Sequence, residues 1–118
     1  MRNENLKLRM KRFALDVIEA VHSLPKTRTA DVLGKQLLRC GTSVGANYRA
    51  ACRARSTADF ISKMTIVEEE TDEAIYWMEL LVESGVIKQS DIDDLVKEAH
   101  ELVAITIASI KTARGSSR

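Results

Sequence analysis

Apolar residues recur every three or four positions along most of the chain, which is the spacing of an amphipathic α-helix. This pattern predicts a first helix over residues 3–24, which Pro25 ends. A second helix is expected to begin at Thr27 or Thr29, whose hydroxyl can cap it, and to continue toward Arg53.

The second half of the chain predicts two more helices. Ser56 followed by Asp59 can cap a third helix, and Gly85 ends it. Ser90 followed by Asp93 can cap a fourth helix in the same way. The third helix has the most regular pattern, because its apolar positions alternate steps of four and three residues. These positions are Phe60, Met64, Val67, Thr71, Ala74, Met78 and Leu81.

Four long helices with short loops predict an all-α fold, an antiparallel up-down-up-down four-helix bundle. Residues 1–118 are expected to form one domain, with residues 115–118 as a frayed tail. The composition agrees, since 30% of the residues are charged, 4% are aromatic and a single proline is present. No apolar run is long enough to span a membrane and no signal peptide is present, which predicts a cytoplasmic protein.

The second helix carries a polar stripe. Gln36, Ser43 and Asn47 follow helical spacing and share one face with Cys40, while Gly41 and Gly45 lie beside them. Glycine within a helix costs about 1 kcal/mol relative to alanine, so a neighbouring helix is expected to approach closely here. The favoured interpretation is structural, with Gln36, Ser43 and Asn47 hydrogen-bonding across the gap; the alternative is a ligand site.

The topology of the bundle sorts the charges. One end collects twelve lysines and arginines against two carboxylates, Glu4 and Asp59, an excess of ten positive charges. The twelve are Arg2, Lys7, Arg9, Lys11, Arg12, Arg49, Arg53, Arg55, Lys63, Lys111, Arg114 and Arg118. The other end is expected to hold the acidic residues Glu79, Glu83, Asp91, Asp93, Asp94, Glu98 and Glu101.

A concentrated basic end is the electrostatic footprint of phosphate binding. The candidates for binding RNA or DNA are Arg49, Arg53, Arg55, Lys63, Arg9 and Arg12. The alternative is that these side chains are ordinary solvated charges. Within the acidic run after Val67, Glu70 or Glu73 is expected to pair with an arginine or with the stripe.

The third helix is apolar almost all round between Ala74 and Val82. This predicts a subunit interface that includes Ile75, Trp77 and Leu80; the alternative is that they complete the core of the monomer. Cys40 and Cys52 lie twelve residues apart on one helix, about 18 Å, too far to form a disulfide, so both are expected to be free thiols.

No enzyme motif is present in the sequence. Glu19 and His22 have the Glu-x-x-His spacing of carboxylate-bridged metal sites, but such sites need two copies and His100 lacks the spacing. There is no Gly-rich phosphate loop and no nucleophile motif. No catalytic residue, metal or cofactor is therefore expected.

One set of residues resembles the 23S rRNA intervening-sequence protein family, also called four-helix bundle proteins. The set is Gln36-Leu37, Arg39, Ser43-Val44, Ala46-Asn47, Arg53, Ser56, Asp59-Phe60 and Glu73. Many members have Glu-Gly shortly after the asparagine, whereas this chain has Ala50-Ala51. The resemblance implies an antiparallel bundle that assembles into a ring, a homopentamer, with no active site.

The same resemblance implies a link to nucleic acid, because relatives serve as accessory proteins to the reverse transcriptases of diversity-generating retroelements and bind nucleic acid through basic surfaces. The leading hypothesis is therefore a non-enzymatic oligomer that binds RNA or DNA. The alternative is a structural or protein-interaction scaffold, for example for a reverse transcriptase, in which the charges keep the ring soluble.

Overall fold

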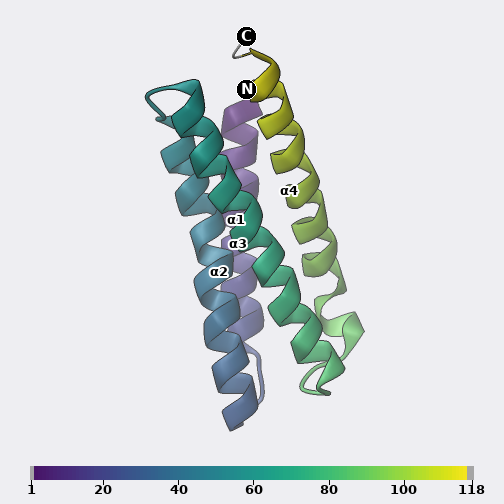
Figure 1. Ribbon diagram of the computed structural model, residues 1–118. Helices are drawn as coiled ribbons and strands as arrows, with labels where there is room; N and C mark the ends of the chain where they lie inside the picture. Colours follow the sequence, from purple (N-terminus) through teal and green to yellow (C-terminus); the bar gives the residue numbers. More distant parts are fainter. Residues whose placement is uncertain (1, 117–118) are drawn as a thin grey trace.

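The computed structural model describes the backbone of residues 2–116 and the side chains of residues 5–115. The helices are α1 (Arg2–His22), α2 (Arg28–Cys52), α3 (Thr57–Glu83) and α4 (Gln89–Ser116). They run alternately up and down beside one another (Figure 1), so the predicted all-α four-helix bundle is confirmed.

Three of the predicted helix ends are confirmed by their hydrogen bonds or backbone angles. Thr27 caps α2, where its hydroxyl accepts a hydrogen bond from the Ala30 N–H at 3.1 Å. Ser56 caps α3 and accepts from the Asp59 N–H at 3.0 Å. Gly85 follows α3 with a φ of +83°, a left-handed conformation that glycine adopts without the steric cost of a side chain.

The two ends of α4 differ from the prediction. The helix begins at Gln89, one residue before Ser90, and the carboxylate of Asp91 accepts a hydrogen bond from the Lys88 N–H at 2.9 Å. The acidic side chain that reaches back is therefore Asp91 and not Asp93. At the other end, residues 115 and 116 continue the helix instead of fraying, and residues 117–118 lie outside the described residues.

The apolar seam of α3 lies in the core. Six of its seven predicted positions are buried and Phe60 is half-buried. They pack with Met10, Phe13 and Val17 of α1 and with the buried residues of α2 and α4. Thr71 is the polar member of the seam, and its hydroxyl donates to the Val67 carbonyl one turn earlier at 2.7 Å. The seam therefore buries no unpaired hydroxyl.

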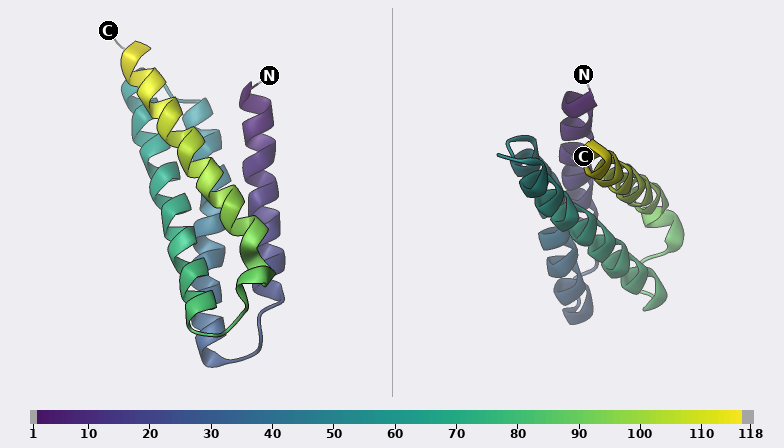
Figure 2. Two further views of the ribbon diagram at one scale, coloured as in Figure 1. Left: turned by 90° about the vertical axis from the view of Figure 1, so that its right-hand side faces the viewer. Right: turned by 45° about the horizontal axis from the view of Figure 1, so that its top comes forward.

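The helices do not pack equally tightly around the bundle. Each of α1 and α3 packs against α2 and α4, so α1 and α3 occupy opposite corners. The helix α4 slants across the bundle, close to α1 near its own start and farther away toward its end (Figure 2). Grooves of about 590 and 440 Å³ open between α1 and α4, the second at the end of the bundle where α1 begins and α4 ends.

Candidate nucleic-acid interface

The start of α1, the end of α2, the start of α3 and the end of α4 meet at one end of the bundle (Figure 1). This is the arrangement that gathers most of the predicted basic residues. The side chains of Arg2, Glu4 and Arg118, which belong to the predicted set, lie outside the described residues. The candidate binding residues can all be placed individually, and they divide into free and paired cations.

Two of the candidate residues, Arg49 and Arg53, line a groove between α1 and α2 together with two lysines. Lys7 and Lys11 come from α1, Arg49 and Arg53 come from α2, and Leu8 completes the lining of a space of about 310 Å³. Each cationic pair is spaced by four residues, so both members share one helical face. None of the four has an ion pair with any described carboxylate. We call these four cations the basic groove.

Arg12, halfway along α1, and Arg55, just after α2, are exposed and also have no ion pair among the described side chains. Lys63, by contrast, is held by Asp59, with 2.6 Å between its ammonium nitrogen and the carboxylate. This hydrogen bond, followed by one from the Arg55 N–H, lowers the pKa of Asp59. The charge of Lys63 is thus already compensated within the chain.

Arg9 is the second paired cation, and it faces α4. Its guanidinium binds both carboxylate oxygens of Glu98, at 3.0 and 2.6 Å, and one oxygen of Glu101 at 3.2 Å. The prediction that Glu98 and Glu101 lie at the end opposite Arg9 is therefore wrong. The antiparallel course of the two helices explains the difference, because Arg9 lies toward the middle of α1 while Glu98 and Glu101 lie toward the middle of α4.

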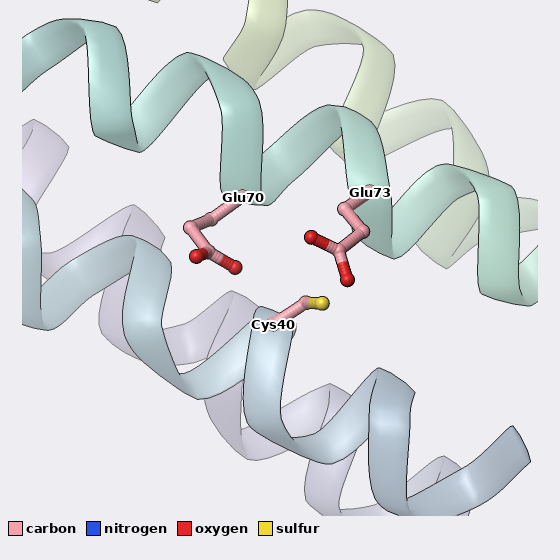
Figure 3. Close-up of side chains that lie close together, drawn as sticks. All are labelled: Cys40, Glu70 and Glu73. Atoms are coloured by element: carbon pink, nitrogen blue, oxygen red, sulfur yellow. The ribbon is translucent and has the colours of Figure 1, made fainter.

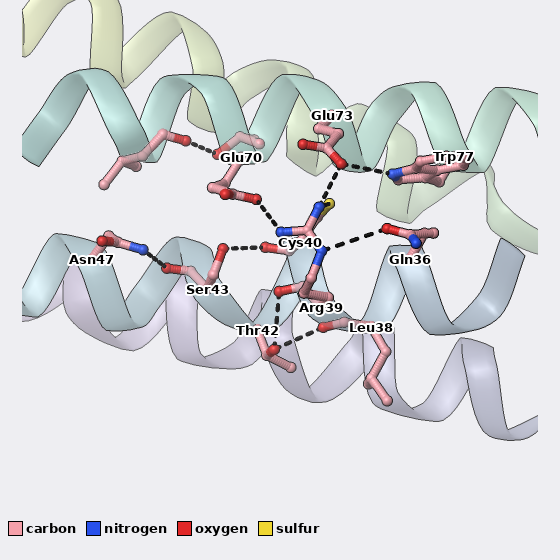
Figure 4. A network of polar contacts seen from close by, with 12 residues as sticks. Gln36, Leu38, Arg39, Cys40, Thr42, Ser43, Asn47, Glu70, Glu73 and Trp77 are labelled. Carbon is pink, nitrogen blue, oxygen red and sulfur yellow. Dashed lines mark hydrogen bonds and ion pairs between the residues drawn. The ribbon is translucent and has the colours of Figure 1, made fainter. Parts of the chain in front are cut away.

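The polar stripe of α2 bonds within its own helix. The Ser43 hydroxyl donates to the Cys40 carbonyl at 3.0 Å, and the Asn47 amide donates to the Ser43 carbonyl at 2.8 Å (Figure 4). Gln36 accepts from Arg39, also on α2, at 3.5 Å. The predicted hydrogen bonds across the gap are wrong for these side chains, because they are only half-buried and reach their own backbone or a neighbouring side chain first.

Arg39 makes the bonds between the helices instead. Its guanidinium binds Glu70 at 3.3 Å and also binds Glu73, both on α3 (Figure 4). The Trp77 indole N–H donates to Glu73 at 3.1 Å, and this bond is the main cause that lowers the pKa of Glu73. The prediction that these glutamates pair with an arginine is confirmed. Arg39 itself appeared only in the family resemblance, and no spacing rule singled it out.

Cys40 lies beside the same two glutamates (Figure 3). One ligand atom from each of Cys40, Glu70 and Glu73 lies within 4.8 Å of the others, the separation expected around a metal ion. The chemistry of the donors disfavours a metal, however. Burial and the neighbouring Glu73 raise the pKa of Cys40 to about 12, so the thiol stays protonated, while both carboxylates already pair with Arg39. The cluster joins α2 to α3.

The family resemblance rests in part on residues just described, namely Arg39, Ser43, Asn47 and Glu73. The family model described as 23S rRNA-intervening sequence protein matches residues 4–108 of the chain. The chain belongs to this family. A solved structure with 35% identity and a TM-score of 0.84 covers 90% of this chain and 98% of its own; it is a protein of unknown function from the S23 ribosomal protein family of Bacteroides thetaiotaomicron VPI-5482. A comparison with curated proteins gives no match.

The predicted interface residues of this intervening-sequence protein divide between core and surface. Ile75 is 5% exposed and packs in the core of its own bundle, so its prediction as an interface residue is wrong. The neighbouring helices of the same chain cover it. Trp77 and Leu80 are half-buried, and Tyr76 between them and Ile75 is 52% exposed, with its ring edge-on to Trp77 at 5.1 Å.

The described helices of this family member do not meet the requirements of a membrane span. None of those in residues 2–116 combines the length and the apolar character needed to cross a bilayer.

Proposed function

We propose that this protein is a non-enzymatic oligomer of the cytoplasm that binds RNA or DNA through its basic end. The observation that carries the proposal is the basic groove, in which Lys7, Lys11, Arg49 and Arg53 converge without a described carboxylate to neutralise them. Four like charges so close together repel one another, and a polyanion relieves that repulsion. Nucleic acid is the polyanion that both the charge and the family support.

The groove favours contact with phosphates over recognition of bases. Arginine donates two parallel hydrogen bonds to a phosphate, and lysine binds it as a point charge. Such contacts fix the position of a nucleic acid and carry little sequence information. The lining of the groove has no aromatic side chain on which a base could stack. Binding is therefore expected to depend strongly on salt and weakly on sequence.

The competing proposal is a scaffold for a protein partner such as a reverse transcriptase, in which the groove only keeps the assembly soluble. Fluorescence anisotropy with structured RNA, duplex DNA and single strands distinguishes the two. We expect binding at about 50 mM salt that weakens by at least tenfold at about 200 mM. If no probe binds at the lower salt, where electrostatic association is strongest, the scaffold takes the place of the nucleic-acid proposal.

The proposed assembly is a ring, a homopentamer, which would repeat the groove around its axis. Light scattering at micromolar concentration tests this, with a mass near five times the 13.2 kDa of the chain as the expected result. A mass near that of one chain contradicts it.

A further inference from the structure

A second groove opens between α1 and α2, at the end of the bundle opposite the basic groove. Its volume is about 840 Å³, against about 310 Å³ for the basic groove. It lies where α1 ends and α2 begins, and the loop that joins these two helices forms part of its lining. We call it the loop groove.

The loop groove carries an excess of positive charge. Lys26, Arg28 and Lys35 line it, and the one carboxylate in the lining is Asp31, which pairs with Lys35 at 3.5 Å. Neither Lys26 nor Arg28 has an ion pair with any described carboxylate. The loop groove can therefore hold phosphates, as the basic groove can.

The two grooves lie along the same side of the α1–α2 pair. Lys11 of the basic groove and Ile18 of the loop groove are seven residues apart on α1, which is about two helical turns, so they share one face. The exposed Asp16 and Glu19 line the groove between α1 and α4 instead. We call the side that carries both the basic groove and the loop groove the α1–α2 flank.

The loop groove differs from the basic groove in its apolar lining. Ile18, Leu24 and Leu38 belong to this lining, and Ile18 is 44% exposed. A phosphate makes no favourable contact with such side chains, whereas the face of a nucleobase does. In a duplex the base faces are stacked on one another, so only an unpaired strand can present both bases and phosphates to the groove.

From the two cationic grooves on one flank and the apolar lining of the loop groove, we infer that the protein binds an unpaired strand of nucleic acid along the α1–α2 flank. Phosphates would lie at the cations of both grooves, and bases would lie on the apolar lining. Arg28 and Arg49 are about 30 Å apart along α2 at 1.5 Å per residue, and one strand would bridge them. The inference rests on the proposed function and names the form of nucleic acid that the site selects.

The first experiment compares an unpaired strand with a duplex. The probe is a labelled oligothymidylate of about 16 nucleotides, measured by fluorescence anisotropy alone and annealed to its complement. Charge alone favours the duplex, which has the higher density of phosphates. Because only the single strand reaches the apolar lining, we expect it to bind at least about threefold more tightly at about 50 mM salt. Equal or tighter binding of the duplex overturns the inference and leaves the proposed function intact.

The second experiment removes two cations of the loop groove, with Lys26→Gln and Arg28→Gln in one chain. The affinity for the strand of about 16 nucleotides should fall about tenfold, and the salt slope should shrink by about 0.7 for each lost phosphate contact. A strand of about 4 nucleotides spans about 14 Å at about 3.4 Å per nucleotide and cannot bridge the two grooves, so its affinity should change little. Lys88→Gln with Lys97→Gln is the matched control, since it removes the same charge from the same half of the bundle and neither lysine lines either groove.

The third experiment tests the bases separately from the phosphates. Ile18→Asn removes apolar area from the loop groove without changing its charge, so the single strand should bind about threefold more weakly with the same salt slope. Binding of the duplex should not change. Val32→Asn is the control, because Val32 is 54% exposed on α2 and lines neither groove. Both positions are exposed, so both variants should fold, and helicity by circular dichroism checks this.

The possible results separate the inference from the proposed function. If the chain with Lys26→Gln and Arg28→Gln loses no more affinity than its control, the strand does not reach the loop groove, whose cations and apolar side chains then suit an acidic segment of a protein partner. If Ile18→Asn binds the single strand as tightly as the parent, the bases do not contact the lining and the inference fails. If the parent binds neither form of nucleic acid, the proposed function itself is wrong.

Discussion

Gly41 of α2 lies directly against Val17 of α1. A Cβ atom placed on Gly41 would come within 2.8 Å of both methyl carbons of Val17 and within 3.1 Å of its Cβ. Val17 is completely buried and β-branched, which restricts the rotation that could move its methyl groups away. Close helix packing thus explains the glycine, as the sequence predicted. The helix that approaches Gly41 is α1, whereas the polar bonds from α2 to another helix go to α3.

This contact predicts that Gly41→Ala destabilises the bundle. The overlap with Val17 is expected to cost about 1–3 kcal/mol, which exceeds or cancels the gain of about 1 kcal/mol from the better helix propensity of alanine. The net result should be a lower free energy of unfolding, measured by denaturation with urea.

Gly45→Ala is the matched control. A Cβ atom there would lie 3.5 Å from Met10, an ordinary van der Waals contact, so only the propensity gain remains. We expect this variant to be more stable than the parent by up to about 1 kcal/mol. If both variants change the free energy of unfolding by the same amount, the distance between the glycine and α1 does not decide the effect of the added methyl group.

A second prediction concerns Arg39, which connects α2 to two carboxylates of α3. Arg39→Met keeps the aliphatic part of the side chain but leaves Glu70 and Glu73 side by side without their cation. Their repulsion should lower the melting temperature. Lys35→Met removes an exposed cation from the same helix, whose pair with Asp31 is 3.5 Å long, and should leave the melting temperature nearly unchanged.

A double-mutant cycle checks that Arg39 acts through its partner. Glu73→Gln removes one of the two like charges, so Arg39→Met should cost less in that background than in the parent. Equal costs in both backgrounds would mean that the pair contributes no coupling.

A third prediction follows from the lowered pKa of Glu73, whose causes are the Trp77 hydrogen bond first and then those of Cys40 and Arg39. The fold favours the ionised carboxylate, so this contribution to stability is present above the ordinary pKa of 4.5. It is lost as the pH falls through the lower pKa of the folded state. Stability should therefore decline in acid below about pH 4.5, and Glu73→Gln should decline less steeply.

The fluorescence of Trp77 reports the same titration, because its indole N–H donates to this carboxylate. Glu69→Gln is the control, since Glu69 is exposed and has no hydrogen bond or ion pair among the described side chains. If Glu69→Gln and Glu73→Gln change the loss of stability in acid equally, the lowered pKa of Glu73 is not the cause of that loss.

Local patterns predicted the helices well, because their ends depend on a few neighbouring residues. The hydroxyls of Thr27 and Ser56 and the positive φ of Gly85 follow from chemistry within four positions of each residue. A cap at Ser90 would start α4 at Asp91, two residues after its observed start at Gln89, since Ser90 and Asp91 offer overlapping caps and only the backbone decides between them. The α3 seam was predicted because its period continues unbroken along the helix.

The candidate site depended on how the helices align with one another, which local sequence patterns do not state. Up-down topology brought Arg49 and Arg53 to the correct end, but the register between α1 and α4 decided that Arg9 would meet Glu98. The groove therefore contains two of the six predicted binding residues, along with Lys7 and Lys11, whose place in it was not foreseen.

The last prediction compares free and paired cations, and it tests the groove against a general basic surface. Arg49→Gln with Arg53→Gln removes two groove charges that have no described carboxylate partner. We expect the affinity for nucleic acid to fall at least tenfold, and the slope of log affinity against log salt to shrink by about 0.7–0.9 for each phosphate that the variant no longer binds. The mass of the assembly is expected to stay the same, because both side chains are exposed and lie outside the core of the bundle.

Arg9→Gln with Lys63→Gln is the matched control, because it removes the same formal charge from the same end of the bundle. Both of these cations are already engaged, Arg9 by Glu98 and Lys63 by Asp59, each at 2.6 Å. Binding a phosphate through them would require breaking these pairs, so the salt slope should change far less than in the groove variant. If the two variants lose affinity and slope equally, binding follows the total charge of the basic end, and the convergence of α1 and α2 on a groove has no part in it.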